Sequence, residues 1–225
     1  MIIAIGVMVT TTVAVAAFYM APKMVEPKNA PQVQPDQPRG FGRSMAWLAI
    51  RTRDTQRLVE ILGLTNPVAA NWDNGLGTVY DEYLAESHVF VSPPVNGWTF
   101  VVGLALPQPL GRAFSDKTTG LLLGLGSVFI EVQYFLAYPA LDYFAWARVV
   151  DGKLVRAYAT TEDGIVWNKG RQTKDEKQLG TTLYEARGVR KRPGDGASEL
   201  VLVPTEAHVV ALAGKWSINP PASTP

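Results

Sequence analysis

Residues 144–160 read FAWARVVDGKLVRAYAT and predict two β-strands joined by a tight turn. The turn falls at Asp151-Gly152, a pair that tolerates the positive φ values of a two-residue hairpin. Asp163-Gly164 supplies the next turn, and the short run Ile165–Trp167 follows it as a third strand. The stretch therefore predicts an antiparallel meander, in which consecutive strands are neighbours.

The same turn predicts which side chains share a face of the sheet. Counting outward from Asp151-Gly152 places Trp146 opposite Ala157 on one face, while Ala147 and Arg156 share the other. A partly polar second face is typical of a sheet that is covered mainly on one side. We therefore expect helices to pack mainly on the face that carries Trp146.

The sequence on either side of the meander predicts further strands and short helices. The patterns indicate strands at Met45–Ile50, Val89–Val91, Trp98–Val102 and Leu200–Val203, and helices that begin near Asp54 (or Thr52), Asn71, Thr173 and Thr205. We expect Gly180 to end the third helix, Gly214 to end the fourth, and Ala207, Val210 and Ala211 to form the apolar face of the fourth. The predicted fold class is α+β, an antiparallel sheet with a meander packed against several helices, in one domain over residues 44–220 with a tail at 221–225.

Residues 121–138 are the most apolar stretch after the N-terminus. One interpretation is a second membrane span with a G-x-x-x-G contact. Glu131 and Gln133 lie inside the stretch and Pro139 ends it, which favours a buried central helix of the domain.

The first 22 residues contain no charged side chain from Ile2 to Pro22, a length that matches the hydrocarbon core of a bilayer. They fit either a membrane anchor or a signal peptide that is cleaved near Ala16. Lys23 and Lys28 follow the segment, and by the positive-inside rule they favour a cytoplasmic domain. The absence of cysteine fits an oxidising envelope compartment. We expect export: a single-pass inner-membrane protein with a periplasmic domain, or a secreted periplasmic protein if cleavage occurs.

Residues 23–43 form a proline-rich tether, because proline recurs every few residues and blocks both helix and sheet.

In the rest of the chain, composition and motifs mainly exclude classes of function. The net charge is +1, which gives no reason to expect nucleic acid as a partner. His88 and His208 have no second histidine at metal-binding spacing, and neither a nucleophile elbow nor a dinucleotide fingerprint is present. We expect no catalytic residues, no metal and no cofactor.

One basic cluster is the candidate surface for a partner. Arg187, Arg190, Lys191 and Arg192 precede a Pro-Gly-Asp-Gly turn, so they predict an exposed loop that meets an acidic protein or anionic lipid. A merely solvated turn is the alternative. Trp98 is added to the candidate partner-binding residues, because an exposed tryptophan is a natural interface anchor.

The order of motifs resembles a broad bacterial family. The resemblance runs over residues 45–180, through Asn96-Gly97-Trp98-Thr99-Phe100-Val101-Val102-Gly103, the Asp151–Tyr158 hairpin, the segment 164–170 and the segment 173–180, with Glu176 near Leu179-Gly180. Some members of that family accompany interbacterial toxins, including type VI secretion effectors, as immunity proteins. These motifs are structural, so the resemblance implies a shared fold first and a shared function second.

The resemblance and the lack of catalytic motifs together predict a non-enzymatic binding protein. We expect a membrane-tethered periplasmic immunity protein, anchored through residues 2–22, that occludes a cognate toxin such as a lipase effector. Two other functions remain open: an envelope hydrolase that uses His88 or His208, and a structural subunit of the envelope.

Overall fold

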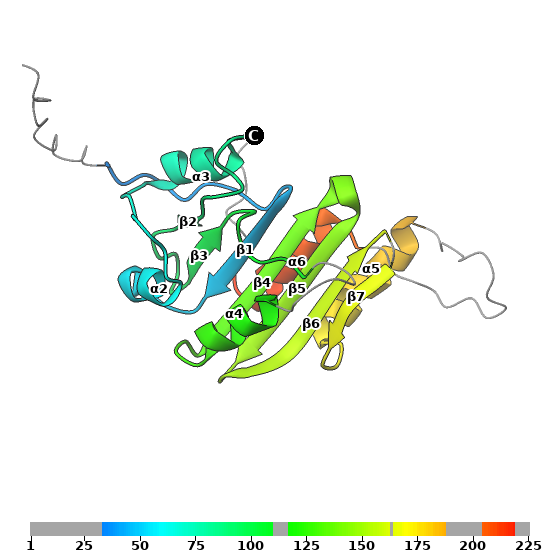
Figure 1. Ribbon diagram of the computed structural model, residues 1–225. Coiled ribbons are helices and arrows are strands. Elements are labelled where there is room, and N and C mark those ends of the chain that lie inside the picture. Colours follow the sequence, from blue (N-terminus) through cyan, green and yellow to red (C-terminus); the bar gives the residue numbers. More distant parts are fainter. Residues whose placement is uncertain (1–32, 110–116, 163, 188–203, 219–225) are drawn as a thin grey trace, which may run out of the picture. The chain divides into compact units, whose positions relative to one another are not determined.

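The computed structural model describes residues 33–109, 117–162, 164–187 and 204–218 (Figure 1). The compact unit of the chain runs from Gln34 to Pro225. Several predictions lie outside the described residues: the membrane segment at 1–22, the strand at 200–203, the tail, and Arg190, Lys191 and Arg192 of the basic cluster. Among the helices that are described, none is both long and apolar enough to span a bilayer.

The core of the domain is a seven-stranded antiparallel sheet, which confirms the predicted α+β class. Its strands lie in the order β2-β3-β1-β4-β5-β6-β7, so β4 to β7 form a meander. Their bounds are β1 (Met45–Ile50), β2 (Phe90–Val91), β3 (Thr99–Val102), β4 (Glu131–Tyr138), β5 (Tyr143–Val150), β6 (Lys153–Thr161) and β7 (Gly164–Lys169). The single turn η1 (Pro139–Leu141) joins β4 to β5.

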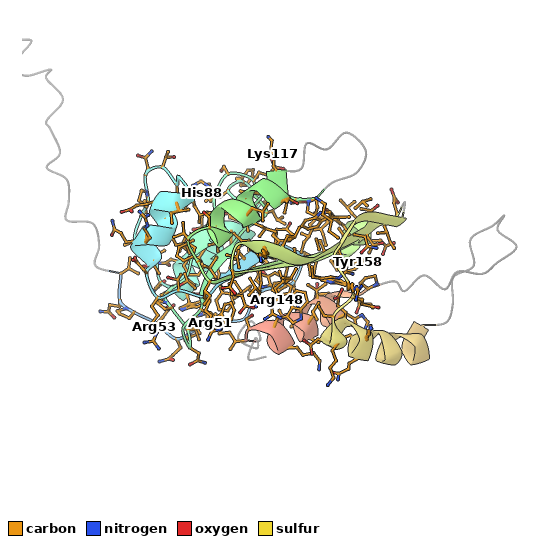
Figure 2. All side chains as sticks on the ribbon, turned by 90° about the horizontal axis from the view of Figure 1, so that it is seen from below. Arg51, Arg53, His88, Lys117, Arg148 and Tyr158 are labelled. Atoms are coloured by element: carbon orange, nitrogen blue, oxygen red, sulfur yellow. The ribbon has the colours of Figure 1, made fainter. Side chains whose placement is uncertain are left out.

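Helices cover both faces of this sheet, so the prediction of a sheet covered mainly on one side is wrong. One core contains Leu58 of α2 (Thr55–Ile61) and Leu122 of α4 (Lys117–Gly126). The core on the other face contains Trp72 of α3 (Trp72–Tyr80) and Trp216 of α6 (Glu206–Trp216). The helix α5 (Lys174–Arg187) lies on the same side as α6 (Figure 2).

The hairpin between β5 and β6 has the predicted turn but not the predicted pairing. Asp151 and Gly152 have φ values of 49° and 73°, as a two-residue turn of this kind requires. The register then shifts between Arg148 and Val149, where Val155 is an extra residue in β6. Because of this bulge, Arg148 rather than Ala147 lies opposite Arg156. A shift of one residue changes the face of every later side chain, so Arg156 joins the face covered by α5 and α6.

The prediction of a helix over residues 121–138 is also wrong. The helix α4 ends at Gly126, and β4 begins at Glu131 as the central strand of the sheet. Seven of the eight residues of β4 are buried. A strand that is covered on both faces is apolar at every position, and in sequence it resembles a buried helix.

The remaining differences concern helix ends. Of the two predicted caps, Thr52 and Asp54, it is Asp54 that caps α2. The predicted helix that starts at Asn71 is α3, and Asn71 is its cap. Gly180 does not end α5, which continues to Arg187, and α6 passes through Gly214 to Trp216. The buried face of α6 differs from the predicted one and consists of Val209, Leu212, Ala213 and Trp216.

Residues 34–43 pack against α3, although the sequence assigned them to the tether. The Asp36 carboxylate accepts hydrogen bonds from the backbone N–H groups of Trp72 and Asp73, each at 2.8 Å. Phe41 is buried and stacks on Trp72 with ring centroids 6.2 Å apart. A carboxylate at the N-terminus of a helix satisfies free N–H groups and is favoured by the helix dipole. We call residues 34–43 the strap.

Candidate interaction surface

Glu176 is the centre of a buried polar cluster that attaches α5 to the sheet. Glu176 forms a capping box with Thr173 at the start of α5. The Thr173 N–H donates to Glu176 Oε2 at 2.7 Å, and the Glu176 N–H donates to Thr173 Oγ1 at 3.1 Å. Trp146 Nε1 donates to Glu176 Oε1 at 2.7 Å, and Arg156 Nε donates to the same oxygen at 2.7 Å. The Glu176 and Arg156 side chains are 3% and 5% exposed, so this ion pair is buried.

The guanidinium of Arg156 has further partners in β6, in β7 and just beyond β7. Its Nη1 donates to Asn168 Oδ1 at 2.7 Å, to the Ala157 carbonyl at 2.9 Å and to the Lys169 carbonyl at 3.1 Å. The cation also lies 5.5 Å from the ring centroid of Tyr158. Buried charges that are paired and hydrogen-bonded in this way hold elements together. We therefore interpret the Glu176–Arg156 pair as the attachment of α5 to the meander.

A second buried carboxylate, Glu131, lies at the start of β4, with its side chain 8% exposed. Its Oε1 accepts from Arg148 Nε at 2.7 Å and from Gln133 Nε2 at 2.8 Å, and its Oε2 lies 3.9 Å from Arg51 Nη1. Gln133 also donates to the Trp216 carbonyl, and the Arg148 guanidinium lies 5.7 Å from the Trp216 ring centroid. Arg148 is thus held between a carboxylate and an indole.

Arg51, Arg53 and Arg148 form what we call the arginine corner. Arg51 and Arg53 follow β1, while Arg148 lies on β5, and β4 between these strands carries Glu131. The Arg51 and Arg148 side chains are 60% and 30% exposed, and Arg53 is exposed. No carboxylate of a described residue lies within ion-pairing distance of Arg53. Figure 2 shows all three arginines toward the side of α6. With one carboxylate among three guanidinium groups, the corner carries an excess positive charge.

The residues that the sequence nominated for partner binding are placed elsewhere. Trp98 is 9% exposed and packs in the core with Phe100, so it offers little surface to a partner. Arg187 is the last residue of α5, and the rest of its basic cluster lies outside the described residues. Sequence reasoning missed the arginine corner because its members lie about a hundred positions apart. The only local signal was two arginines spaced by one residue directly after a buried strand.

The two histidines occupy separate local structures. The exposed His88 has Nδ1 2.9 Å from Ser87 Oγ and 3.2 Å from the Leu84 carbonyl. His208 Nδ1 accepts from the Thr205 N–H at 3.0 Å and so completes the cap of α6. Within the part of the chain that the structure describes, no group of three or more acidic or histidine side chains could hold a metal ion.

Two tyrosine hydroxyls are buried under the other face of the sheet. Neither Tyr134 OH nor Tyr143 OH has a hydrogen-bond partner among the described residues. Burial raises the pKa of Tyr134 well above its ordinary value, and the nearby Tyr143 adds to the shift. Burial likewise raises the pKa of Tyr143. Burial therefore favours the neutral form of both side chains in the folded protein.

Comparison with known proteins adds no further assignment, since no protein-family model, no curated protein and no solved structure matches the chain.

Proposed function

We propose that the protein is a non-enzymatic binding protein, held at the inner membrane by its first 22 residues, that neutralises an envelope-targeting toxin by occlusion. The partner in this proposal is a toxin, for example a lipase effector, with an acidic surface near its active site. In this proposal the domain lies in the periplasm, where such a toxin acts.

The arginine corner is the observation that carries this proposal. Arginine is enriched among the residues that dominate protein interfaces. Arg148 is held in one orientation by Glu131 and Trp216, so little side-chain entropy remains to be lost on binding. Arg51 and Arg53 extend the positive surface into solvent, where charge speeds association with an acidic partner. Arg148 lies on β5 and Arg51 directly follows β1, so the sheet fixes the backbone positions of both.

The buried polar groups support the same proposal from another direction. Glu176 and Arg156 are the most enclosed charged pair of the described residues, and their hydrogen bonds attach α5 to the meander. A carboxylate with that role is a structural group rather than a general acid or base.

The direct test is binding of the full chain, in mild detergent, to the product of a neighbouring toxin-like gene. We expect charge reversal at Arg51 and Arg53 to weaken the complex at least tenfold, because reversal at an interface replaces attraction with repulsion. The matched control is Lys174→Glu, which reverses an exposed charge at the start of α5. Equal affinities for the control and the Arg51→Glu/Arg53→Glu variant would remove the arginine corner from the proposal. The absence of any toxin-like neighbouring gene would contradict the immunity function itself.

A reporter fused after Pro225 tests the placement. A reporter that is active only in the periplasm is expected to give signal. Activity of a reporter that works only in the cytoplasm would refute the periplasmic location.

A further inference from the structure

The end of α3 and the turn that follows it expose two tyrosines. Tyr83 is 88% exposed, Tyr80 is 45% exposed and Leu84 is 38% exposed. Single exposed apolar side chains are ordinary on a protein surface, but these three lie within residues 80–84 and form one patch. Tyrosine is also enriched among the residues that dominate protein interfaces. We call residues 80–86 the tyrosine turn.

Hydrogen bonds hold the backbone of the tyrosine turn in place. Asp81 Oδ1 accepts from the Tyr83 N–H at 2.9 Å and from the Leu84 N–H at 3.2 Å. The Tyr80 hydroxyl donates to the Arg43 carbonyl at 3.2 Å, which ties the turn to the end of the strap. A surface that is fixed before a partner arrives loses little conformational entropy on binding.

The tyrosine turn is also acidic. Asp81, Glu82 and Glu86 are all exposed. No described lysine or arginine forms an ion pair with any of these three carboxylates. The exposed Arg43 of the strap faces Glu206 instead, with their charged atoms 3.8 Å apart. Carboxylates around an exposed aromatic ring suit a guanidinium group, which pairs with carboxylates and stacks on the faces of aromatic rings.

The arginine corner, which has the complementary charge, lies at the opposite end of β1. Tyr80 is held where the strap enters β1, whereas Arg51 and Arg53 follow Ile50, the last residue of that strand. A strand of this length spans about 20 Å. Figure 2 shows His88, just after the tyrosine turn, on the upper side of the domain, and Arg51 and Arg53 on the lower side. A contact between the two surfaces therefore requires two copies of the chain.

We infer that copies of the chain associate head to tail, with the tyrosine turn of one copy on the arginine corner of the next. Charge complementarity selects a second copy as the occupant, because one surface carries three exposed carboxylates and the other an excess of guanidinium groups. The ring of Tyr83 then lies within reach of a guanidinium, and Arg53 gains the carboxylate partner that no described residue of its own chain supplies. The two surfaces differ, so the contact is heterologous and each copy keeps one surface free for another.

This contact would also regulate the arginine corner. A second copy and an acidic toxin would compete for the same guanidinium groups, so self-association covers the corner until a toxin displaces the neighbouring copy. That regulatory role rests on the proposed function, whereas the self-association itself does not. The contact is made by exposed charges, so it weakens as the salt concentration rises.

Sedimentation velocity of the full chain in density-matched mild detergent, at low salt and over a range of protein concentrations, measures the self-association. Arg51→Glu/Arg53→Glu makes the corner acidic, and Glu82→Lys/Glu86→Lys makes the turn basic. Each double variant alone is expected to self-associate at least tenfold more weakly than the unchanged chain, because like charges then face each other. An equimolar mixture of the two variants is expected to restore association, since each altered surface meets its complement on the other variant.

Tyr83→Ser is a second test that changes no charge, and it is also expected to weaken the association. Its matched control is Ile165→Ser on β7, where the replaced side chain is 50% exposed. Lys174→Glu is the control for charge reversal at an exposed position. An unchanged chain that stays monomeric at every concentration would overturn the inference. A mixture that associates no better than either variant alone would also overturn it.

The variant Glu82→Lys/Glu86→Lys separates this inference from the proposed function, because it leaves the arginine corner intact. Loss of self-association with toxin binding retained is the result expected if both hold. Toxin binding by an unchanged chain that never self-associates would overturn this inference alone. Self-association without toxin binding would overturn the proposed function and leave the contact between copies standing.

Discussion

Loss of the Glu176 carboxylate tests the attachment of α5 most directly. In Glu176→Ala, the 5% exposed Arg156 keeps its charge but loses its ion pair, and Trp146 Nε1 and the Thr173 N–H lose their acceptor. Removal of one partner of a buried ion pair costs about 3–5 kcal/mol. A typical domain is stable by about 5–15 kcal/mol, so this single change should remove a large part of the free energy of unfolding.

The assay is urea unfolding of the full chain in mild detergent, followed by circular dichroism, on Glu176→Ala, Arg156→Met and the double variant. We expect the double variant to lose about 2 kcal/mol less free energy of unfolding than the two single variants together, because no unpaired charge stays buried when both side chains are replaced. The exposed pair Arg57 and Glu60 is the control, with an expected coupling of at most about 0.5 kcal/mol. A cost below about 1 kcal/mol for Glu176→Ala, or a coupling no larger than the control, would refute the interpretation of Glu176 as the attachment point.

Two further predictions concern the packing of the domain. Because the pKa values of Tyr134 and Tyr143 are raised in the folded state, the stability they contribute is complete below pH 10 and falls as the pH rises above it, by up to about 1.4 kcal/mol per pH unit for each tyrosine. Urea titrations at alkaline pH should show this slope, and replacing both tyrosines with phenylalanine should flatten it. An unchanged slope in the double variant would contradict the burial of the hydroxyls. A methyl group at Gly75 would clash with the Phe90 ring, while one at Gly77 would meet nothing. Thermal unfolding should therefore show Gly75→Ala destabilised by about 1–3 kcal/mol and Gly77→Ala stabilised by about 0.5–1 kcal/mol. The opposite order would contradict the packing of α3 on β2.

Local signals predicted much of the fold because turns and caps act over a few residues. Asp151-Gly152 marks the β5–β6 hairpin, and Asp54 and Asn71 mark the starts of two helices. The Val155 bulge had no such signal, since an extra residue in a strand is stabilised by what lies on each face of the sheet. The bulge buries Arg156 against α5, and a count of residues from the turn assigns this arginine to the wrong face.

The failure at residues 121–138 has a related cause. Periodicity separates helix from strand only where one face is solvated, and β4 is buried on both. The two polar residues of that stretch, Glu131 and Gln133, have partners in β5 and α6 that only the fold brings near. The candidate site was missed for the same reason. The arginine corner is brought together only by the pairing of β1 and β5 with β4, and no local sequence pattern announces that pairing.

The strap determines how the domain responds to a mechanical load. The chain passes from residue 33 through the strap to Met45 of β1, which lies near the middle of the sheet. Tension from the N-terminal side meets the hydrogen bond from Asn71 Nδ2 to the Gln34 carbonyl first and the two hydrogen bonds of Asp36 next. The Arg39–Asp73 ion pair and the buried ring of Phe41 follow. Only after these contacts have broken does the pull reach the backbone hydrogen bonds of β1. In the proposed membrane-anchored protein, the contacts of the strap would therefore break before the hydrogen bonds that pair β1 with β3 and β4.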